Sequence, residues 1–384
     1  MELTSAIGSI MIVSSDDRAF LTHRKPMAKA ADNASAHLFV VCRDTGHIDK
    51  ISALGYNVIA LKKRTNRINL FTILLTIHEL VDIYRKVKPD IIHHSSLYVS
   101  FLGSIASLFV KGPKIITAIT GVGYLFSSSS VKASAIRLLL TPLLRFLWSR
   151  PNHSSLFQNQ DDRELFAQNR LCAQHVRIIP GSGVDIKKFI PAKKTQHKTN
   201  KKIIIGCASR LLKDKGLEEL VRAISLLPDH LDIKLNIAGT IDPKNPSSFT
   251  QQEIEKWKQN PKVELLGQIT DMVTFWQGCD MAILPSHREG LPKSLLEAAA
   301  CGLPLLGADV AGTRELIEDG VNGRLFTKGQ KDEIAEAITV LSKDKLFLKR
   351  AGLASRQKIE REGFSDQAVE ANYREFLLSI QNRA

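Results

Sequence analysis

Short apolar runs alternate with amphipathic stretches along the whole chain, and this alternation limits the possible folds more than any other feature. The clearest amphipathic stretch, residues 68–88, ends directly before Pro89 and is predicted to be a helix. The strand-like runs of the first half are Ile7–Val13, His37–Cys42, Asn57–Leu61, Asp90–His94, Lys114–Ile119 and Val176–Pro180. Strands that alternate with helices pair in parallel, so a parallel sheet is predicted.

The same alternation starts again after a predicted linker at residues 186–200, which from Pro191 on is polar and basic and has no apolar period. The strand-like runs that follow are Ile203–Ala208, Ile233–Ala238, Lys262–Leu266, Met281–Leu284 and Leu303–Ala308. We therefore predict an α/β protein of two Rossmann-like, doubly wound domains. They comprise residues 1–185 and 201–366 and face each other across a cleft.

The segment Glu289–Pro304, EGLPKSLLEAAACGLP, places two carboxylates around the start of a helix. Pro292 suits the first turn of a helix, and Gly302 followed by Pro304 ends that helix after about three turns. Because a strand-like run ends just before the segment, Glu289 is predicted to lie on a strand-to-helix loop. Parallel α/β sheets bind their ligands at such loops.

This segment contains the groups that a nucleotide sugar requires. The backbone N–H groups of Gly290 and Leu291, at the start of the helix, suit a phosphate. The carboxylates of Glu289 and Glu297 can accept hydrogen bonds from the hydroxyl groups of a sugar and a ribose. The alternative is that Glu289 only complements the helix dipole and that Glu297 lies on a solvated helix face.

Three cations follow the strand-like run Ile203–Ala208. Arg210, Lys213 and Lys215 are expected at the carboxyl end of that strand, on the same side of the sheet as Glu289. A guanidinium and an ammonium group in this place can neutralise a diphosphate and stabilise it as a leaving group. The alternative is an ordinary basic loop with an exposed turn.

The positive charge of the chain is concentrated in its first half. The net charge is +14, and residues 1–200 carry 27 Lys and Arg against 13 Asp and Glu, whereas the remaining residues carry 26 of each kind. This asymmetry indicates an anionic partner surface, either acidic lipid headgroups or nucleic acid. The alternative is a basic surface without a specific partner.

The sequence favours a cytoplasmic protein at the membrane surface. We predict no signal peptide and no membrane span, since Arg137, Pro142 and Arg145 interrupt the most apolar stretch. That stretch, residues 131–150, reads as a basic amphipathic helix that lies in a membrane interface or, alternatively, packs on the core. The five scattered cysteines show no metal-binding spacing and indicate a reducing compartment.

Taken together, these motifs resemble the retaining GT-B glycosyltransferases of the family-4 type, also called glycosyltransferase group 1. The segments that carry the resemblance are Ser209–Arg210, Lys215–Gly216, Ile237–Gly239, Leu266–Gly267, Pro285–Ser286, Glu289–Pro292, Glu297–Ala298 and Gly312–Gly323. Residues 181–189 are similar to the interdomain passage of that family. The resemblance spans the whole second domain.

The resemblance implies that the second domain holds a nucleotide-sugar donor, with uridine diphosphate as the most frequent carrier in the family. Arg210 and Lys215 would contact the diphosphate, and Glu289 the transferred sugar. The donor-binding residues would be Gly239, Gly267, Ile269, Gly290, Leu291, Pro292 and Glu297, the last on the ribose. Transfer would retain the anomeric configuration. No D-x-D motif is present, so no metal and no other cofactor is expected, and the cations take the place of the metal.

In the first domain, the resemblance is to enzymes that build bacterial surface polysaccharides, such as lipopolysaccharide O-antigen or capsule, on a polyprenyl-diphosphate carrier. It rests on residues 20–24, His93–His94 and residues 120–126. The transferred sugar would be a hexose or an N-acetylhexosamine. The acceptor contacts would come from His23, His94, Gly121 and Tyr124. As in similar enzymes, the last helix, residues 367–384, would pack back on the first domain.

Two alternatives use the same features differently. A sugar-nucleotide epimerase or a phosphorylase could share the two-domain fold, although the two spaced glutamates disfavour the epimerase and the chain is short for a phosphorylase. A basic protein could also bind nucleic acid. The low aromatic content of 6% and the lack of a recognisable binding module disfavour that reading.

Overall fold

The computed structural model describes residues 7–62, 69–121, 130–192, 202–243 and 245–383. The chain divides into two compact units. Unit 1 comprises Met1–Ser182 and Gln367–Ala384, and unit 2 comprises Gly183–Asp366. Val184 and Phe189 are buried in the core of unit 2, so residues 186–192 belong to that unit and not to a linker. The rest of the predicted linker lies outside the described residues.

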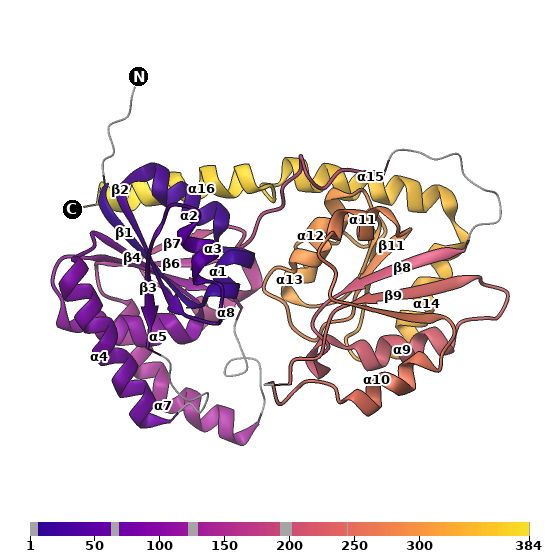
Figure 1. Ribbon diagram of the computed structural model, residues 1–384, viewed down its shortest axis with the longest axis horizontal. Helices are drawn as coiled ribbons and strands as arrows, with labels where there is room; N and C mark the ends of the chain where they lie inside the picture. Colours follow the sequence, from indigo (N-terminus) through magenta and orange to yellow (C-terminus); the bar gives the residue numbers. More distant parts are fainter. Residues whose placement is uncertain (1–6, 63–68, 122–129, 193–201, 244, 384) are drawn as a thin grey trace. The chain divides into compact units, whose positions relative to one another are not determined.

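Unit 1 is built on a parallel sheet of seven strands in the order β3-β2-β1-β4-β5-β6-β7 (Figure 1). The strands are β1 Ile7–Asp16, β2 Ser35–Arg43, β3 Asn57–Leu61, β4 Ile91–Ser95, β5 Lys114–Ile119, β6 His153–Phe157 and β7 His175–Ile178. The helices are α1 Asp17–His23, α2 Lys25–Ala34, α3 Ile48–Ser52, α4 Leu70–Val87, α5 Leu97–Ala106, α7 Val131–Trp148, α8 Gln160–Gln168 and α16 Asp366–Gln381, with the 3₁₀ turn η1 Ser107–Phe109.

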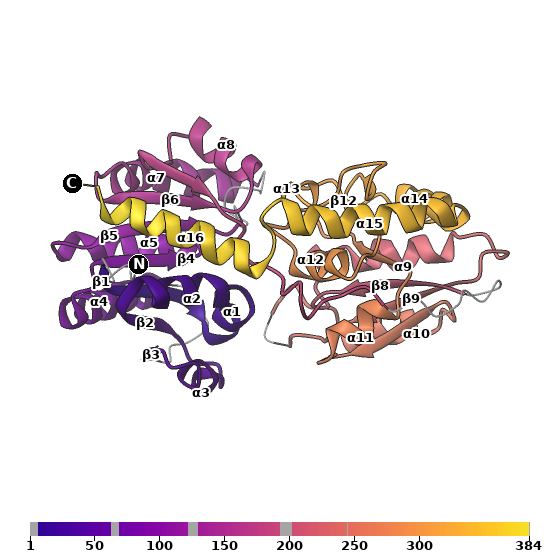
Figure 2. The same cartoon turned by 90° about the horizontal axis from the view of Figure 1, so that it is seen from above.

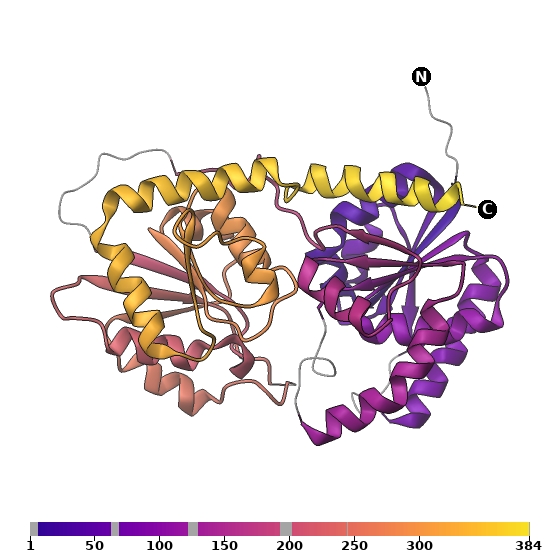
Figure 3. The same ribbon diagram turned by 180° about the vertical axis from the view of Figure 1, so that it is seen from behind.

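Helices cover both faces of this sheet. One apolar core joins the sheet to α2 and α16, and two further clusters join the other face to α4, α5, α7 and α8. Figure 1 shows α2 and α16 above the unit 1 strands, and in Figure 3 α4 and α7 form the layer below them. The doubly wound architecture predicted for this half is therefore confirmed.

The C-terminal helix α16 is part of unit 1, although it follows unit 2 in sequence. It crosses the unit 1 sheet in Figure 2 and buries five apolar or aromatic side chains against it. These are Val369, Tyr373, Phe376, Leu377 and Ile380. The Nζ of Lys114, at the start of β5, donates to the carbonyls of Ile380 and Gln381 at 3.0 Å each. This cation satisfies carbonyls at the end of the helix, where the dipole favours positive charge.

Unit 2 has a parallel sheet of six strands in the order β10-β9-β8-β11-β12-β13. The strands are β8 Ile203–Ala208, β9 Ile233–Ala238, β10 Val263–Gly267, β11 Met281–Leu284, β12 Leu305–Ala308 and β13 Gly323–Phe326. The helices are α9 Leu217–Ser225, α10 Gln251–Lys258, α11 Met272–Gln277, α12 Lys293–Ala300, α13 Ala311–Arg314, α14 Lys331–Lys343 and α15 Lys345–Arg361, with the 3₁₀ turn η2 Lys213–Lys215. Separate apolar cores fill the two faces of the sheet.

The helix predicted after Glu289 is present as α12, and one detail of the prediction is wrong. Pro292 is the N-cap residue, with an extended backbone at ψ 110°, and does not lie in the first turn. The helix starts at Lys293 and spans 8 residues. Gly302, at φ +75°, follows its end in a left-handed conformation that glycine adopts without strain.

Within the described residues, no helix combines the length and the apolar composition that a membrane span requires.

Candidate functional site

The carboxyl ends of three unit 2 strands meet at Gly239. Its N–H donates to the carbonyl of Gly267 at 2.8 Å, and the N–H of Ser209 donates to Ala238 at 3.0 Å. A Cβ atom at position 239 would lie 1.9 Å from the carbonyl oxygen of Ser209. Only glycine therefore lets the ends of β8, β9 and β10 approach this closely. Gly267, at φ +66°, faces open space at the same edge of the sheet.

A second glycine brings the basic turn after β8 against the loop after β11. Gly216 has φ +66°, and a Cβ atom there would lie 2.1 Å from the carbonyl oxygen of Pro285. The N–H of His287 donates to the carbonyl of Asp214 at 2.9 Å, which fixes the same contact. The turn η2 is thus held close to the residues that precede α12.

Lys215 and Glu289 form the central ion pair of this edge. Lys215 Nζ lies 2.6 Å from Glu289 Oε1, and the two side chains are only 16% and 15% exposed. A charge-assisted hydrogen bond of this length, largely shielded from water, is much stronger than an exposed ion pair. It orients the carboxylate and leaves Oε2 available to accept hydrogen bonds from a polyol.

The loop that carries Glu289 is fixed from the other side by α13. The N–H of Gly312 donates to the carbonyl of Glu289 at 3.1 Å, and a Cβ atom at position 312 would lie 2.5 Å from the oxygen of Gly290. Leu291 is buried in the apolar core. No side chain caps the N-terminus of α12 among the described residues, so the helix start can offer its N–H groups to an anion.

Glu297 lies on α12, and its surroundings exclude the solvated helix face that the sequence left open. The Nε1 of Trp276 donates to Oε2 of Glu297 at 3.5 Å. Burial raises the pKa of this carboxyl group, and Lys293 and the indole partly oppose that shift. A half-buried carboxylate with one indole donor can still accept hydrogen bonds from the vicinal hydroxyls of a ribose.

The structure does not bring Arg210 to this pair. Its side chain is 65% exposed, and its Nη1 lies 4.0 Å from Oδ2 of Asp242. Lys213 lies 3.7 Å from Glu253. Among the cations expected at this edge, it is Lys215 that contacts Glu289 within the described residues. Ile269, predicted beside the nucleotide base, packs against the apolar core below the edge.

The predicted acceptor residues of unit 1 are not all equivalent. His94 is fully buried, shares a hydrogen bond of 2.8 Å between its Nε2 and the hydroxyl of Tyr84, and would clash with any Cβ at Gly103. Burial lowers the pKa of His94 to about 3, so its ring is neutral. This histidine packs in the core and is not exposed to an acceptor, which corrects the prediction for His94.

Of the other three predicted acceptor residues, the structure describes His23 and Gly121. His23 is at the end of α1, and its Nδ1 lies 2.8 Å from the hydroxyl of Ser182. Gly121 follows β5 at φ +123°, a conformation that favours glycine. Tyr124 lies outside the described residues. His23 and Gly121 therefore stay candidates for acceptor contacts.

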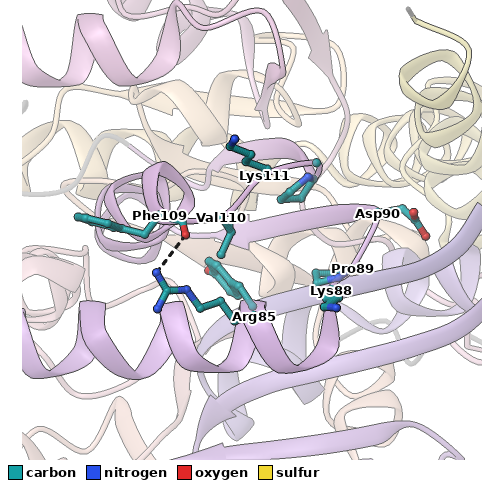
Figure 4. Close-up of a pocket in the computed structure, with 10 residues that line it drawn as sticks. Arg85, Lys88, Pro89, Asp90, Phe109, Val110 and Lys111 are labelled. Carbon is teal, nitrogen blue, oxygen red and sulfur yellow. Dashed lines mark hydrogen bonds between the residues drawn. The ribbon is translucent and has the colours of Figure 1, made fainter.

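A cavity of about 430 Å³ lies elsewhere in unit 1, at the amino ends of β4 and β5. Its lining includes Arg85, Lys88 and Lys111, and Figure 4 shows Asp90 at its rim. The carboxylate of Asp90 accepts the backbone N–H of Ser9 at 2.7 Å. Parallel sheets bind substrates at the carboxyl ends of their strands. This cavity lies at the amino ends, so we do not assign it to the candidate site.

Two residues of functional interest escaped the sequence analysis. Trp276 is the partner of Glu297, but nothing in the sequence relates a tryptophan on α11 to a glutamate on α12. Arg24 is buried without a carboxylate partner among the described residues. It stands beside His23 in the segment of residues 20–24 that carries the resemblance, but its burial does not follow from that position.

Two family models match the chain. The model described as "Glycosyl transferases group 1" matches residues 189–363, and the model described as "Glycosyl transferase 4-like" matches residues 10–150. The first match includes Lys215, Glu289 and Glu297.

Curated relatives are similar over most of their length. One is the N,N'-diacetylbacillosaminyl-diphospho-undecaprenol alpha-1,3-N-acetylgalactosaminyltransferase of Campylobacter jejuni, 27% identical over 88% of this chain and 90% of the relative. Another is the UDP-Gal:alpha-D-GlcNAc-diphosphoundecaprenol alpha-1,3-galactosyltransferase of Escherichia coli, 23% identical over 82% of each chain.

Solved structures are similar across both units. The crystal structure of Anabaena Alr3699/HepE in complex with UDP has a TM-score of 0.76 at 19% identity, with 97% of this chain and 100% of that chain covered. This similarity supports the fold, since each unit is a parallel-sheet α/β domain of the kind found in GT-B glycosyltransferases.

Proposed function

The chain belongs to the group 1 glycosyltransferases, and we propose that it transfers a sugar from a nucleotide sugar to a saccharide carried on a lipid diphosphate. The observation that carries this proposal is the shielded pair of Lys215 and Glu289 beside the N-terminus of α12. One cation, one oriented carboxylate and one helix start are the groups that a sugar diphosphate requires. The relatives assign the reaction class, and both of them act on lipid-diphosphate-linked sugars by name.

On the donor side, each group has a distinct proposed role. The N–H groups at the start of α12 and the ammonium of Lys215 bind the diphosphate. Oε2 of Glu289 accepts hydrogen bonds from hydroxyls of the transferred sugar, and Glu297 accepts those of the ribose. Arg210, long and mostly exposed at the end of β8, can turn from Asp242 toward the diphosphate when the donor binds.

We propose a retaining reaction that requires no metal ion. As the bond between the sugar and the diphosphate breaks, negative charge accumulates on the leaving phosphate oxygen, and Lys215 and the helix start stabilise it. The leaving diphosphate takes the proton of the acceptor hydroxyl on the same face of the sugar. Both relatives make alpha linkages by name, as a retaining enzyme would from an alpha-linked donor.

For the donor we propose a uridine diphosphate sugar that carries a hexose or an N-acetylhexosamine. The E. coli relative uses UDP-Gal by name, and the C. jejuni relative transfers N-acetylgalactosamine. The acceptor would be a saccharide on a polyprenyl diphosphate in the assembly of a surface polysaccharide.

The acceptor lipid implies contact with a membrane, and unit 1 has a surface that suits it. In α7, Leu144, Leu147 and Trp148 pack on the core, whereas Leu138 and Leu139 are each 77% exposed. The first turns of α4 likewise expose Leu70, Phe71 and Leu74. We propose that this apolar surface, within the basic half of the chain, lies on the anionic inner leaflet of the cell membrane.

Exchange of the two exposed leucines of α7 for aspartate is expected to release the protein from anionic vesicles. Each leucine contributes roughly 1.5–3 kcal/mol when it leaves water, so L138D/L139D should weaken vesicle binding at least about tenfold. Vesicle flotation measures this effect. The matched control is L346D/L353D on α15, which changes two leucines that are 66% and 57% exposed in unit 2. Equal binding by both variants would argue against the membrane surface.

The proposed function is tested by the release of nucleoside diphosphate from a panel of nucleotide sugars, with and without lipid-diphosphate acceptors. A glycosyltransferase releases the diphosphate only when an acceptor is present. Release that does not depend on the acceptor, together with a change in the sugar, would indicate the epimerase instead.

A further inference from the structure

The cavity of about 430 Å³ at the amino ends of β4 and β5 lies outside the candidate site, and cations dominate its charged lining. Its walls come from the end of α4, the turn into β4 and the segment between η1 and β5 (Figure 4). The charged residues that line it are Arg85, Lys88, Asp90 and Lys111, and we call it the amino-edge cavity. Its volume is in the range of sites that hold a small molecule, and its charge favours an anion.

The one carboxylate of this lining already has partners. Oδ2 of Asp90 accepts the N–H of Ser9 at 2.7 Å and the hydroxyl of Ser9 at 3.3 Å, so it is directed at β1. The N–H of Asp90 donates to the carbonyl of Ser9 at 3.0 Å, and its carbonyl accepts the N–H of Lys114 at 2.8 Å. These four hydrogen bonds fix the rim of the amino-edge cavity, so the cavity is formed before any ligand enters.

The three cations are not neutralised in the part of the chain that the structure describes. No carboxylate among the described residues forms an ion pair with Arg85, Lys88 or Lys111, and all three residues are exposed. Nη2 of Arg85 lies 3.4 Å from the carbonyl of Phe109, which is a long hydrogen bond. A guanidinium has five donors and an ammonium has three, so most of these donors stay available to an anion.

Lys88 has a backbone conformation that favours glycine. It is the C-cap residue of α4, at φ 52° and ψ 55°, in the left-handed region. Glycine adopts this conformation without strain, whereas a residue with a Cβ atom is strained there. Among the described residues, Arg170 is the one other non-glycine residue with a positive φ. Strain that a backbone retains marks a candidate functional residue, and here the strained residue directs a cation toward the cavity.

The dipole of α4 explains only part of this arrangement. Cations interact favourably with the C-terminal end of a helix, and α4 has Arg85 and Lys86 in its last turn. Lys86 serves the dipole without lining the cavity. Lys111 belongs to the segment after η1 and not to α4, and the dipole does not explain why position 88 is a lysine instead of a glycine. A common anionic ligand explains all three lining cations.

Apolar side chains lie next to the cations. Phe109 lines the amino-edge cavity and is 56% exposed, and its neighbour Leu108 is 43% exposed. A ligand that fits this site therefore has an anionic group for the cations and a carbon skeleton for the aromatic ring. A phosphate ester has both parts, and its oxygens accept hydrogen bonds from guanidinium and ammonium groups.

We propose that the amino-edge cavity binds a phosphate ester, which is either a soluble small molecule or the headgroup of a phospholipid. Arg85, Lys88 and Lys111 bind the phosphate, and Phe109 contacts the carbon skeleton. Parallel sheets bind their substrates at the carboxyl ends of the strands, so a ligand at the amino ends is a third molecule besides donor and acceptor. This site does not depend on the proposed function.

Two probes distinguish the two sources of the phosphate ester. Calorimetry with sn-glycerol 3-phosphate measures binding of a soluble ester, and flotation with vesicles of phosphatidylglycerol and phosphatidylcholine measures binding of a headgroup. Lys111→Met should weaken binding of the matching probe roughly 3- to 10-fold, the loss expected for one charged hydrogen bond at an exposed site. Lys86→Met is the matched control, because it removes the same charge from outside the cavity, and it should change binding less than about twofold.

Lys88→Gly separates a loss of binding from a loss of stability. Glycine relieves the left-handed strain, so the thermal transition of unit 1 should move to a higher temperature while binding weakens roughly 3- to 10-fold. Arg170→Gly relieves the same kind of strain away from the cavity and should leave binding unchanged. Binding of both probes to Lys88→Gly and Lys111→Met as tightly as to the wild-type protein would overturn the proposal.

Lys215→Met separates this site from the candidate site of unit 2. Binding of sn-glycerol 3-phosphate should persist in Lys215→Met, and loss of binding there but not in Lys111→Met would assign the ligand to the candidate site and overturn the proposal. If the wild-type protein transfers no sugar but Lys111→Met weakens binding, the amino-edge site stands and the proposed function fails. If transfer occurs and the cavity variants bind normally, the proposed function stands and this site fails.

Discussion

Exchange of Lys215 for methionine is expected to lower the rate of sugar transfer by about 10²–10³-fold, the loss typical of one preorganised group that stabilises a developing anion. The same exchange should also destabilise unit 2. Glu289 would lose the partner that lies 2.6 Å away, in a place where its side chain is only 15% exposed. Removal of one partner of a buried ion pair lowers the free energy of unfolding by about 3–5 kcal/mol. Because this pair is partly exposed, we expect a value near the lower end of that range. The sequence motif alone does not reveal this cost, because the contact between Lys215 and Glu289 is seen only in the structure.

The double variant K215M/E289Q separates the two effects. It removes both charges, so the thermal stability of unit 2 should return toward the wild-type value, while transfer stays lost. Lys213→Met is the matched control, because Lys213 lies two residues away and its side chain is 60% exposed. Differential scanning calorimetry and initial rates measure the two effects. A double variant that regains transfer would show that neither charge is needed for catalysis.

Exchange of Phe376 for alanine is expected to destabilise unit 1 by about 3–5 kcal/mol, the range for truncation of a buried phenylalanine. Phe376 is fully buried on α16, and its ring lies 5.1 Å from that of His175 on β7, measured between centroids. Calorimetry should show a lower transition temperature for unit 1 and an unchanged one for unit 2. Leu353→Ala on α15, at a residue that is 57% exposed, is the control. An unchanged unit 1 transition would mean that α16 contributes little to that unit.

The sequence predicts the alternation of strands and helices because buried parallel strands are continuous apolar runs. Asn57–Leu61, Lys114–Ile119, Ile203–Ala208 and Ile233–Ala238 are strands with the predicted bounds. The strand β6, HSSLF, was missed, because three of its five residues are polar. A buried polar side chain of this strand bonds to a residue distant in sequence. The hydroxyl of Ser155 accepts a hydrogen bond from the N–H of Ala173 at 2.9 Å. Such tertiary contacts leave no periodic signal in the sequence.

The candidate site is predictable where it depends on local structure. The loop position of Glu289 and the helix that carries Glu297 follow from the apolar run before them and from Pro292 and Gly302. The pairing of Lys215 with Glu289 is a contact across 74 positions. It depends on Gly216 meeting the carbonyl of Pro285, which sequence patterns do not reveal. For the same reason, the exposed position of Arg210 could not be foreseen.

The histidines of unit 1 show how burial changes the interpretation of a motif. The pair His93–His94 reads as two candidate ligands in the sequence, but adjacent residues of a strand point to opposite faces. His94 therefore packs against Tyr84 on one face, while His93 meets Tyr373 on the other. Each ring keeps one buried nitrogen without a hydrogen-bond partner within the described residues, Nε2 in His93 and Nδ1 in His94.

The most direct test of the account is the structure of the product that the wild-type protein makes from an alpha-linked nucleotide sugar and a lipid-diphosphate saccharide in the presence of EDTA. The account predicts one added sugar by mass spectrometry, an alpha linkage by nuclear magnetic resonance, and a rate that EDTA does not change. A beta linkage, or transfer that stops until a divalent metal ion is restored, would contradict it.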